Sequence, residues 1–435
     1  MFTDPTKLLF RMPAKTEVVI TGIGVVSPIG IGREAFAESL RLGRSGVGPL
    51  QRYDPSGLPV RFAAEVTGFD PRQYVRPRKS LKVMSHDIQL GFAAASLAYE
   101  DADIEGGSLD PERLGVVFGS DMLYCDVPEI ATVYRSCIVD GAFQYDRWGP
   151  TAMNDLNPLW MLKYLPNMSA CHIGIAYDAR GPNNSITHAD ISSTEAISEA
   201  AGVIERGLAD VMFTGGTGTW VSPTKLSFHS DAIMSHREDD PQGASRPFDA
   251  DRDGMVNGEG AAALMLESRH HAESRGAKIL ARISGYALGF EARGKGGPWK
   301  GTAVRSTIQR ALGAAGISPD DVGHVNANGL STRSDDAVEA QAIRDMLGRT
   351  PVTALKSYFG NTGAGSGAME LLGSVLAFEH GEVPATLNYE TPDDDCPINV
   401  IHGAALPVEK QTALVLSQAM MGQAAAIVLH GPAAM

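Results

Sequence analysis

Short apolar runs of β-branched and aliphatic residues recur along the whole chain, and they constrain its fold more than any other feature. Three of them, Glu17–Ile23, Leu114–Gly119 and Asp210–Gly216, contain or end in glycine, and Ala413–Gln418 is a further run of strand length. Such runs are typical of strands buried on both faces, and glycine permits the tight turns that follow them. The runs therefore predict a buried parallel or mixed sheet.

Alanine-rich segments with helical spacing lie between these runs. They are Ile88–Asp101, Ser193–Arg206, Thr302–Ala315 and Asp336–Leu347. Strands that alternate with helices predict an α/β fold in which helices cover both faces of the sheet.

The order of these elements occurs twice. Corresponding segments begin at Val18 and Ala281, at Val116 and His324, at Ser185 and Ser357, and at Asp210 and Ala413. Four matches in one order indicate a duplicated half, although any α/β protein repeats strand, turn and helix. We expect an N-terminal extension over residues 1–16, a first half over 17–270 and a second half over 271–435.

Charge and composition exclude several classes of partner. The 37 basic and 51 acidic residues give a net charge of −14, which repels phosphate backbones and anionic lipids, so neither nucleic acid nor a membrane is expected to bind. The chain has no apolar run of about 20 residues and no apolar core of a signal peptide, which predicts a cytoplasmic protein. The four cysteines lack metal-ligand spacing, so we expect no metal and no cofactor.

Two segments stand outside the repeated scheme. Residues 122–166 are long and rich in aromatic side chains, which predicts a structured cap or interface region rather than a linker. Arg72–Lys82 is a basic run on an acidic protein, and a solvated helix start is the simplest explanation of such a run.

Six motifs, in order from about Glu17 to the C-terminal region, resemble those of the β-ketoacyl synthase family. They are VVITGIGVVSPIG, RGPNNSITHADISS, ASRPFDADRDGMVNGEGAAALMLE, VNANGLST, KSYFGNTGAGSGAMELL and VPATLNYETPDDDC. The chain is thereby identified as a member of the condensing enzymes of fatty-acid and polyketide synthesis, of the elongating-ketosynthase or chain-length-factor type. The resemblance implies a thiolase-like, five-layered αβαβα fold with two pseudo-duplicated halves.

The resemblance also locates the family's catalytic cysteine and two histidines. The matching positions hold Asp190, Asn328 and Asn361, so all three side chains differ. A carboxylate that attacks a thioester gives a mixed anhydride, which lies uphill of the thioester, so Asp190 is a poor acyl carrier. Asparagine has no titratable group and cannot act as a base, although its N–H can donate to an oxyanion. We therefore expect these positions to be inactive in condensation.

Neighbouring positions match the family in part. Lys356 and Glu370 match a buried Lys–Glu pair, which is expected to persist because removing one partner strands a charge. Met420 stands where the family has a gating phenylalanine. Thr332 is the threonine retained from the motif that holds the carrier's phosphopantetheine arm, and Leu330 replaces the other.

Other roles for Asp190 stay open. It is a favourable cap for the helix that follows, and it also resembles an anionic mimic of the thiolate that shapes a pocket. His188 lies two residues earlier, so on an extended segment it would share a face with Asp190 and assist hydrolysis. His172 and Cys171 are interpreted as core residues.

The resemblance implies two protein partners. In the family, basic residues ahead of the first long helix contact the acidic acyl carrier protein, and the matching residues here are Lys79 and Lys82, with Arg76 and Arg78 adjacent. The segment Asn167–Ile175 is expected to pair across a two-fold axis and to extend one sheet through both subunits of a homodimer or heterodimer.

These observations lead to three hypotheses of function. The favoured one is a non-condensing ketosynthase homologue that binds an acyl chain or a carrier protein, comparable to chain-length-factor subunits. The second is an acyl-thioester enzyme of altered chemistry, a malonyl decarboxylase or a hydrolase that uses Asp190. The third is a structural homodimer with a filled pocket. Whether the chain is an enzyme is left open.

Overall fold

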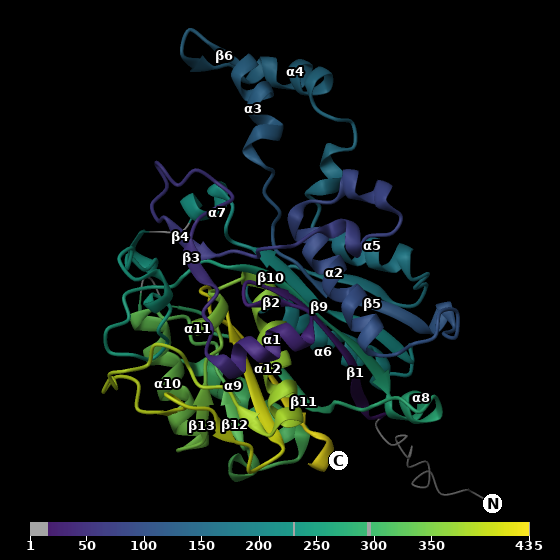
Figure 1. The fold of residues 1–435 in the computed structure, drawn as a ribbon, viewed down its shortest axis with the longest axis vertical. Coiled ribbons are helices and arrows are strands. Elements are labelled where there is room, and N and C mark those ends of the chain that lie inside the picture. The colour runs from purple at the N-terminus through teal and green to yellow at the C-terminus, as the bar shows by residue number, and fades with distance from the viewer. Residues whose placement is uncertain (1–15, 229–230, 294–296, 435) are drawn as a thin grey trace, which may run out of the picture.

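The computed structural model describes residues 16–434 except 229–230 and 294–296, so the expected extension lies outside the described residues apart from Thr16. One twelve-stranded mixed sheet runs through the molecule, with helices on both of its faces (Figure 1). This arrangement confirms the predicted α/β fold class. No helix in the described part of the chain is long and apolar enough to cross a bilayer.

The sheet consists of two halves with the same strand order. The first half is β1 (Val18–Ser27), β10 (Glu259–Ser268), β9 (Val211–Thr219), β5 (Leu114–Gly119) and β8 (Asn183–Ile186). The second half is β11 (Ala281–Phe290), β18 (Gln423–His430), β17 (Thr412–Gln418), β12 (His324–Asn326) and β13 (Pro351–Thr353), and β15 (Asn399–Val400) follows it at the edge. In each half the first three strands are antiparallel and the next two are parallel. The predicted duplication is therefore confirmed.

A short antiparallel contact joins the halves, in which Val18–Ile20 of β1 pair with residues 281–283 of β11. The twelfth strand, β2 (Gly30–Ile31), pairs with the end of β1. Three small two-stranded sheets lie outside the main sheet. They are β3 (Val47–Pro49) with β4 (Phe62–Ala64), β6 (Ile138–Val139) with β7 (Ala142–Phe143), and β14 (Glu382–Val383) with β16 (Leu406–Pro407).

The helices of the body include all four that were predicted from sequence. They are α1 (Arg33–Leu42), α2 (His86–Asp101), α5 (Met168–Ala176), α6 (Ser192–Glu205), α7 (Pro223–Phe228), α8 (Arg269–Ser274), α9 (Thr302–Ala315), α10 (Arg333–Leu347), α11 (Lys356–Phe359) and α12 (Ser366–His380). Glycine lets one helix approach each half closely. A Cβ at Gly22 of β1 would lie 2.3 Å from the Ala98 carbonyl oxygen of α2, and one at Gly285 of β11 would lie 2.4 Å from the Ala311 carbonyl oxygen of α9. The two halves therefore use the same packing device.

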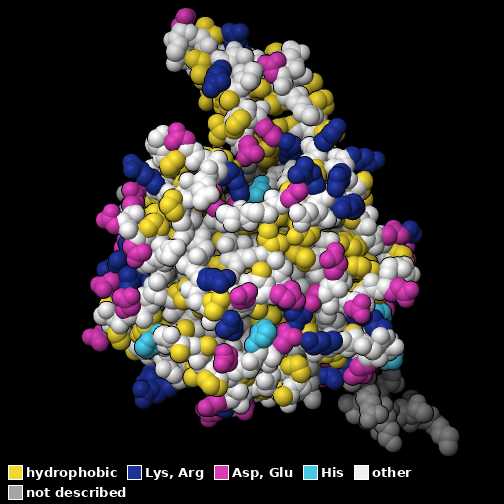
Figure 2. All heavy atoms as spheres, viewed as in Figure 1, with side chains coloured by type: hydrophobic (Ala, Val, Ile, Leu, Met, Phe, Trp, Pro, Cys, Tyr) yellow, Lys and Arg dark blue, Asp and Glu magenta, His cyan; other side chains and the backbone are white. Residues whose placement is uncertain are grey.

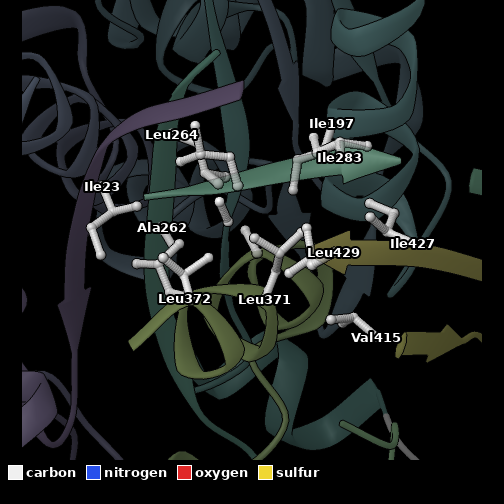
Figure 3. Packing of buried hydrophobic residues seen from close by; sticks show 14 of the residues in the cluster. Ile23, Ile197, Ala262, Leu264, Ile283, Leu371, Leu372, Val415, Ile427 and Leu429 are labelled. Atoms are coloured by element: carbon white, nitrogen blue, oxygen red, sulfur yellow. The ribbon is translucent and has the colours of Figure 1, made fainter. Parts of the chain in front are cut away.

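Buried aliphatic side chains from both halves form a shared core. Figure 3 shows Ile283 of β11 beside Ile197 of α6, with Leu371 of α12 and Ile23 of β1 in the same cluster. These side chains are almost fully excluded from water, which makes their packing the main source of stability in this region. The core fixes α6 and α12, and the candidate site lies at the N-terminal ends of these two helices.

Residues 122–166 form an arm that projects from the body above β5 and α7 (Figure 1). It contains α3 (Val127–Ser136), β6, β7, α4 (Trp148–Asp155) and the 3₁₀ turn η6 (Trp160–Lys163), so the prediction of a structured segment is confirmed. Many of its large apolar side chains are exposed, as the yellow side chains in Figure 2 show. They are Met122, Val127, Tyr134, Ile138, Tyr145, Met153, Leu159 and Met161.

One prediction about the sheet edge is wrong. Asn167–Ile175 does not form a strand, because Met168–Ala176 form helix α5, which buries Ala170 and Ile173 on one face against α2 and β5. The strand at the end of the first half is β8, and β5 is its ladder partner.

Candidate functional site

Asp190 lies at the turn between β8 and α6. Ala189 adopts the left-handed conformation with a φ of 52°, and the turn directs Asp190 inward, where it is 4% exposed. Its carboxylate oxygen Oδ1 accepts a hydrogen bond from Nδ2 of Asn361 at 3.3 Å. The N-cap of α6 is Ile191, so the interpretation of Asp190 as the helix cap is wrong.

Asn361 lies before α12 and is held in a single orientation. Its side-chain oxygen accepts hydrogen bonds from the N–H of Gly363 at 3.0 Å and from the hydroxyl of Ser366 at 3.1 Å. Because both of these donors contact the oxygen, the amide nitrogen must face Asp190. The two residues, from opposite halves of the sequence, therefore form one buried polar pair.

Asn328 follows β12 and points toward a buried lysine. Its side-chain oxygen accepts hydrogen bonds from Nζ of Lys356 at 3.0 Å and from the N–H of Gln418 at 3.2 Å. The backbone N–H of Asn328 donates a hydrogen bond to the carboxylate of Glu339 at 2.8 Å. Lys356 also forms an ion pair with Glu370, and both side chains are almost completely buried. The structure thus brings Asn328, Lys356 and Glu370 together.

The environment of Asp190 disfavours its anion. Burial raises the pKa of Asp190 to about 6, and the negative charge of Asp121 adds to the shift, whereas Lys356 and the bond from Asn361 oppose it. Attack by this carboxylate on a thioester would give a mixed anhydride, which lies uphill of the thioester. The arrangement can bind and orient a polar group, but it offers no thiolate.

His188 does not pair with Asp190. Its side chain is 45% exposed, and its Nδ1 lies 2.7 Å from the carboxylate of Glu195 on α6. The structure therefore separates the two members of the proposed hydrolytic dyad, one facing solvent and the other facing the interior. Within the described residues, no group of three or more His, Cys, Asp or Glu side chains is placed to hold a metal ion.

Little space is open beside Asn328. A cavity of about 30 Å³ adjoins Asn328 and is also lined by Leu330, Gln418 and the half-buried Met420. Thr332 is the N-cap residue of α10, and its hydroxyl donates to the carboxylate of Asp335, another lining residue, at 2.7 Å. The hydroxyl of Thr332 is thus engaged within the protein.

The basic run is exposed on the surface. Arg76, Arg78, Lys79 and Lys82 are all exposed, and the last three lie in the 3₁₀ helix η3 (Arg78–Val83) just ahead of α2. Figure 2 shows dark blue side chains gathered near the foot of the arm. A role for these residues in docking stays a prediction.

Three neighbours of the site were not predicted from the sequence. Oδ2 of Asp121, just beyond β5, accepts hydrogen bonds from Nε1 of Trp220 at 2.9 Å and from Nζ of Lys225 at 2.7 Å. Asp121 follows a glycine-ended strand parallel to β8, and the carboxyl ends of parallel strands meet at one edge of a sheet. The position of Asp121 after a predicted strand could therefore have identified it from the sequence. The contacts of Trp220 and Lys225 with Asp121 are visible only in the tertiary structure.

Comparisons with known proteins agree with this fold. The model "Beta-ketoacyl synthase, N-terminal domain" matches residues 15–272, and "Beta-ketoacyl synthase, C-terminal domain" matches residues 280–390. The chain is 34% identical to a 3-oxoacyl-[acyl-carrier-protein] synthase 2 of Coxiella burnetii, with 95% of this chain and 98% of that protein covered. It is 35% identical to a putative polyketide beta-ketoacyl synthase 1 of Streptomyces cyaneus, with 96% and 98% covered.

Solved structures give the same result. The ishigamide ketosynthase/chain length factor matches with a TM-score of 0.84 at 28% identity, covering 96% of this chain and 100% of that one. A type II polyketide synthase acyl-carrier protein in complex with its ketosynthase, AntDE:AntF, matches with a TM-score of 0.81 at 29% identity, covering 96% and 99%. The chain belongs to the beta-ketoacyl synthase family.

Proposed function

We propose that this protein is a non-condensing ketosynthase homologue that acts by binding, as a chain-length-factor-like subunit for an acyl chain and its acyl carrier protein. The observation that supports this most is the buried pair of Asp190 and Asn361. In our assignment these residues, with Asn328, occupy the positions of the family's cysteine and histidines.

The chemistry of these residues favours binding over condensation. Condensation needs a thiolate to hold the acyl chain and a base or strong donor to assist decarboxylation. Asp190 is desolvated and bonded to Asn361, while the side-chain oxygen of Asn328 already accepts from Lys356. The amide N–H groups can still orient a carbonyl oxygen, so the site retains the ability to hold a thioester without cleaving it.

A partner subunit accounts for the exposed features of the first half. The outer edge of β8 is the end of the main sheet, and the arm exposes a series of large apolar side chains. An uncovered sheet edge and an apolar surface of this kind are normally covered by another chain. We propose that a second ketosynthase-fold subunit, either another copy or a homologue, pairs here. The ketosynthase/chain length factor structure supports this by similarity.

We further propose that Arg76, Arg78, Lys79 and Lys82 dock the acyl carrier protein. These four side chains form a basic surface on a protein of net charge −14, which would otherwise repel an acidic carrier.

We also propose that the two halves of the chain divide near residue 270 and that the protein is located in the cytoplasm.

Charge reversal tests the docking. Lys79→Glu combined with Lys82→Glu is expected to weaken binding of a labelled acidic carrier protein by about ten-fold at low salt, with a smaller difference at high salt because ions screen the surface charges. The matched control is Lys278→Glu combined with Lys410→Glu, which changes the net charge equally on the second half. Equal weakening by both pairs, or no carrier binding by the unsubstituted protein, contradicts the docking proposal.

A further inference from the structure

Three side chains fill the space beside the Asp190–Asn361 pair. Trp220 follows β9, Lys225 lies on α7, and Asp121 follows β5, and the carboxylate of Asp121 accepts hydrogen bonds from both of the others. We call these three residues the plug. Because they come from three separate elements, their contact depends on the complete fold of the first half.

The plug forms a wall of the site. A Cβ at Gly363 would lie only 2.4 Å from Nε1 of Trp220, so the indole packs directly on the turn whose N–H holds Asn361. Trp220 belongs to the same buried apolar cluster as Met255, whose sulfur lies 4.0 Å from Nδ2 of Asn361. Any chain that extends inward past Asn361 on this side meets the indole.

The plug is fixed rather than loosely packed. Trp220 is 4% exposed, and the ion pair between Lys225 and Asp121 is largely buried. The ammonium of Lys225 also lies 4.8 Å from the centre of the Tyr124 ring and 5.6 Å from that of the Trp220 ring. Swinging the indole aside breaks a hydrogen bond to the largely buried carboxylate of Asp121 and removes a cation–π contact with Lys225. Both losses oppose opening.

The region behind the plug is also unsuited to an alkyl chain. A cavity of only about 20 Å³ adjoins Lys225, and its lining combines polar side chains such as His86 and Asp87 with apolar and aromatic ones such as Leu123 and Tyr124. Asp87 is about nine-tenths buried. An alkyl chain placed there would separate these polar groups from water and from one another without replacing their hydrogen bonds. The small volume of this cavity therefore leaves no room for a long alkyl chain.

We propose that the plug of Asp121, Trp220 and Lys225 sets the specificity of the site by admitting a short acyl unit beside Asp190 and excluding long alkyl chains. This inference rests on the proposed function, in which an acyl group reaches Asp190. It names the ligand class, which is a short acyl thioester rather than a fatty acyl chain.

A thiol introduced at position 190 tests the proposal, because its labelling rate can be compared between reagents with short and long alkyl chains. In the Asp190→Cys variant, the introduced thiolate displaces iodide from an N-alkyl iodoacetamide, so that a C–S bond forms, the C–I bond breaks, and the thiol proton passes to buffer. Labelling rates with an ethyl and a dodecyl reagent are measured by mass spectrometry. We expect the ethyl reagent to react at least about ten-fold faster, and Trp220→Ala added to Asp190→Cys to bring the two rates close together.

Two kinds of control are needed. The chain without Asp190→Cys reports the labelling of its four native cysteines. Trp148→Ala removes an indole that packs against Tyr134 and Phe143 of the arm. The milder Trp220→Leu and Lys225→Met variants reduce the plug in two further ways if Trp220→Ala does not fold. The ethyl rate, together with circular dichroism, shows whether the site is intact. Both reagents reach the same thiol by the same route in every variant, so a change in their rate ratio between variants reports the change made at the plug.

The outcomes are separable from the proposed function. Equal rates for the two reagents in Asp190→Cys, or a rate ratio unchanged by every folded plug variant, overturns the specificity proposal. Neither result depends on whether the native chain binds a carrier protein or forms an acyl adduct, which are the observations that test the proposed function.

Discussion

The two halves of the molecule share strand order and helix packing but differ in the segments that connect corresponding strands to the next helix. After β5 the chain makes the exposed arm at residues 122–166, whereas after β12 only residues 327–332 precede α10. The first half ends in the outer strand β8. The comparison shows that a duplicated scaffold can carry an exposed apolar arm on one half and a buried polar network on the other.

The rigidity of the second half has a clear physical basis. The carboxylate of Glu339 accepts the N–H groups of Asn328 and Gly329 at 2.8 and 2.9 Å, and Lys356 connects Asn328 to Glu370. All of these side chains are buried, so each unpaired group would carry a full desolvation cost. The arm has no comparable network of buried ion pairs among its described residues, where Lys163 with Glu129 is the one ion pair.

The largest effect is expected from breaking the second-half network. Lys356→Met leaves Glu370 buried without its cation, so the free energy of unfolding at about pH 8 should fall by roughly 3–5 kcal/mol in urea denaturation. The matched change at the exposed Lys410 should stay within about 0.5 kcal/mol. Adding Glu370→Gln to Lys356→Met should recover part of the loss. An unchanged unfolding free energy for Lys356→Met contradicts this picture of the second half.

The pair that joins the halves should respond to pH. The pKa of Asp190 is about 6 in the fold against an ordinary value of 3.8, so the fold favours the protonated acid and loses stability as pH rises between these values. Asp190→Asn cannot ionise and still accepts the bond from Asn361. It should raise the free energy of unfolding by roughly 3 kcal/mol at about pH 8 and by little below about pH 4. A gain that is the same at both pH values would mean that Asp190 is not destabilised by burial.

Substitutions on the arm of the first half should affect subunit association rather than the stability of the single subunit. Tyr145→Asp with Met153→Asp on the arm is expected to weaken subunit association about 30-fold, or roughly 2 kcal/mol, and to leave unfolding of the subunit nearly unchanged. Both side chains are 85% exposed in the single chain, so burial against a partner is the one role that we assign to them. Phe290→Asp with Leu406→Asp is the matched pair on the second half. Analytical ultracentrifugation that returns a monomer near 46 kDa for the unsubstituted protein at micromolar concentration contradicts pairing through this surface.

Local sequence patterns predicted much of this fold. Thr302–Ala315 and Leu114–Gly119 have the predicted bounds, because glycine stands just outside both ends of the helix and apolar runs mark the strand. The strand assigned to Asn167–Ile175 came from the family resemblance and was wrong, because Met168–Ala176 form helix α5 and the strand before Asp190 is β8. The plug was missed because Asp121 and Trp220 are separated by 99 residues, and no local pattern reports such a contact.

Intact-protein mass spectrometry decides whether the site binds an acyl group without condensing it. The protein is incubated with acyl-carrier and malonyl-carrier thioesters, and both the protein mass and the ketoacyl product are measured. We expect no acyl adduct and no product, because a desolvated carboxylate bonded to Asn361 stands in place of a thiolate. An acyl mass shift that maps to the peptide containing Asp190 would show that Asp190 accepts an acyl group, and a ketoacyl product would show that the site condenses; either result contradicts the account.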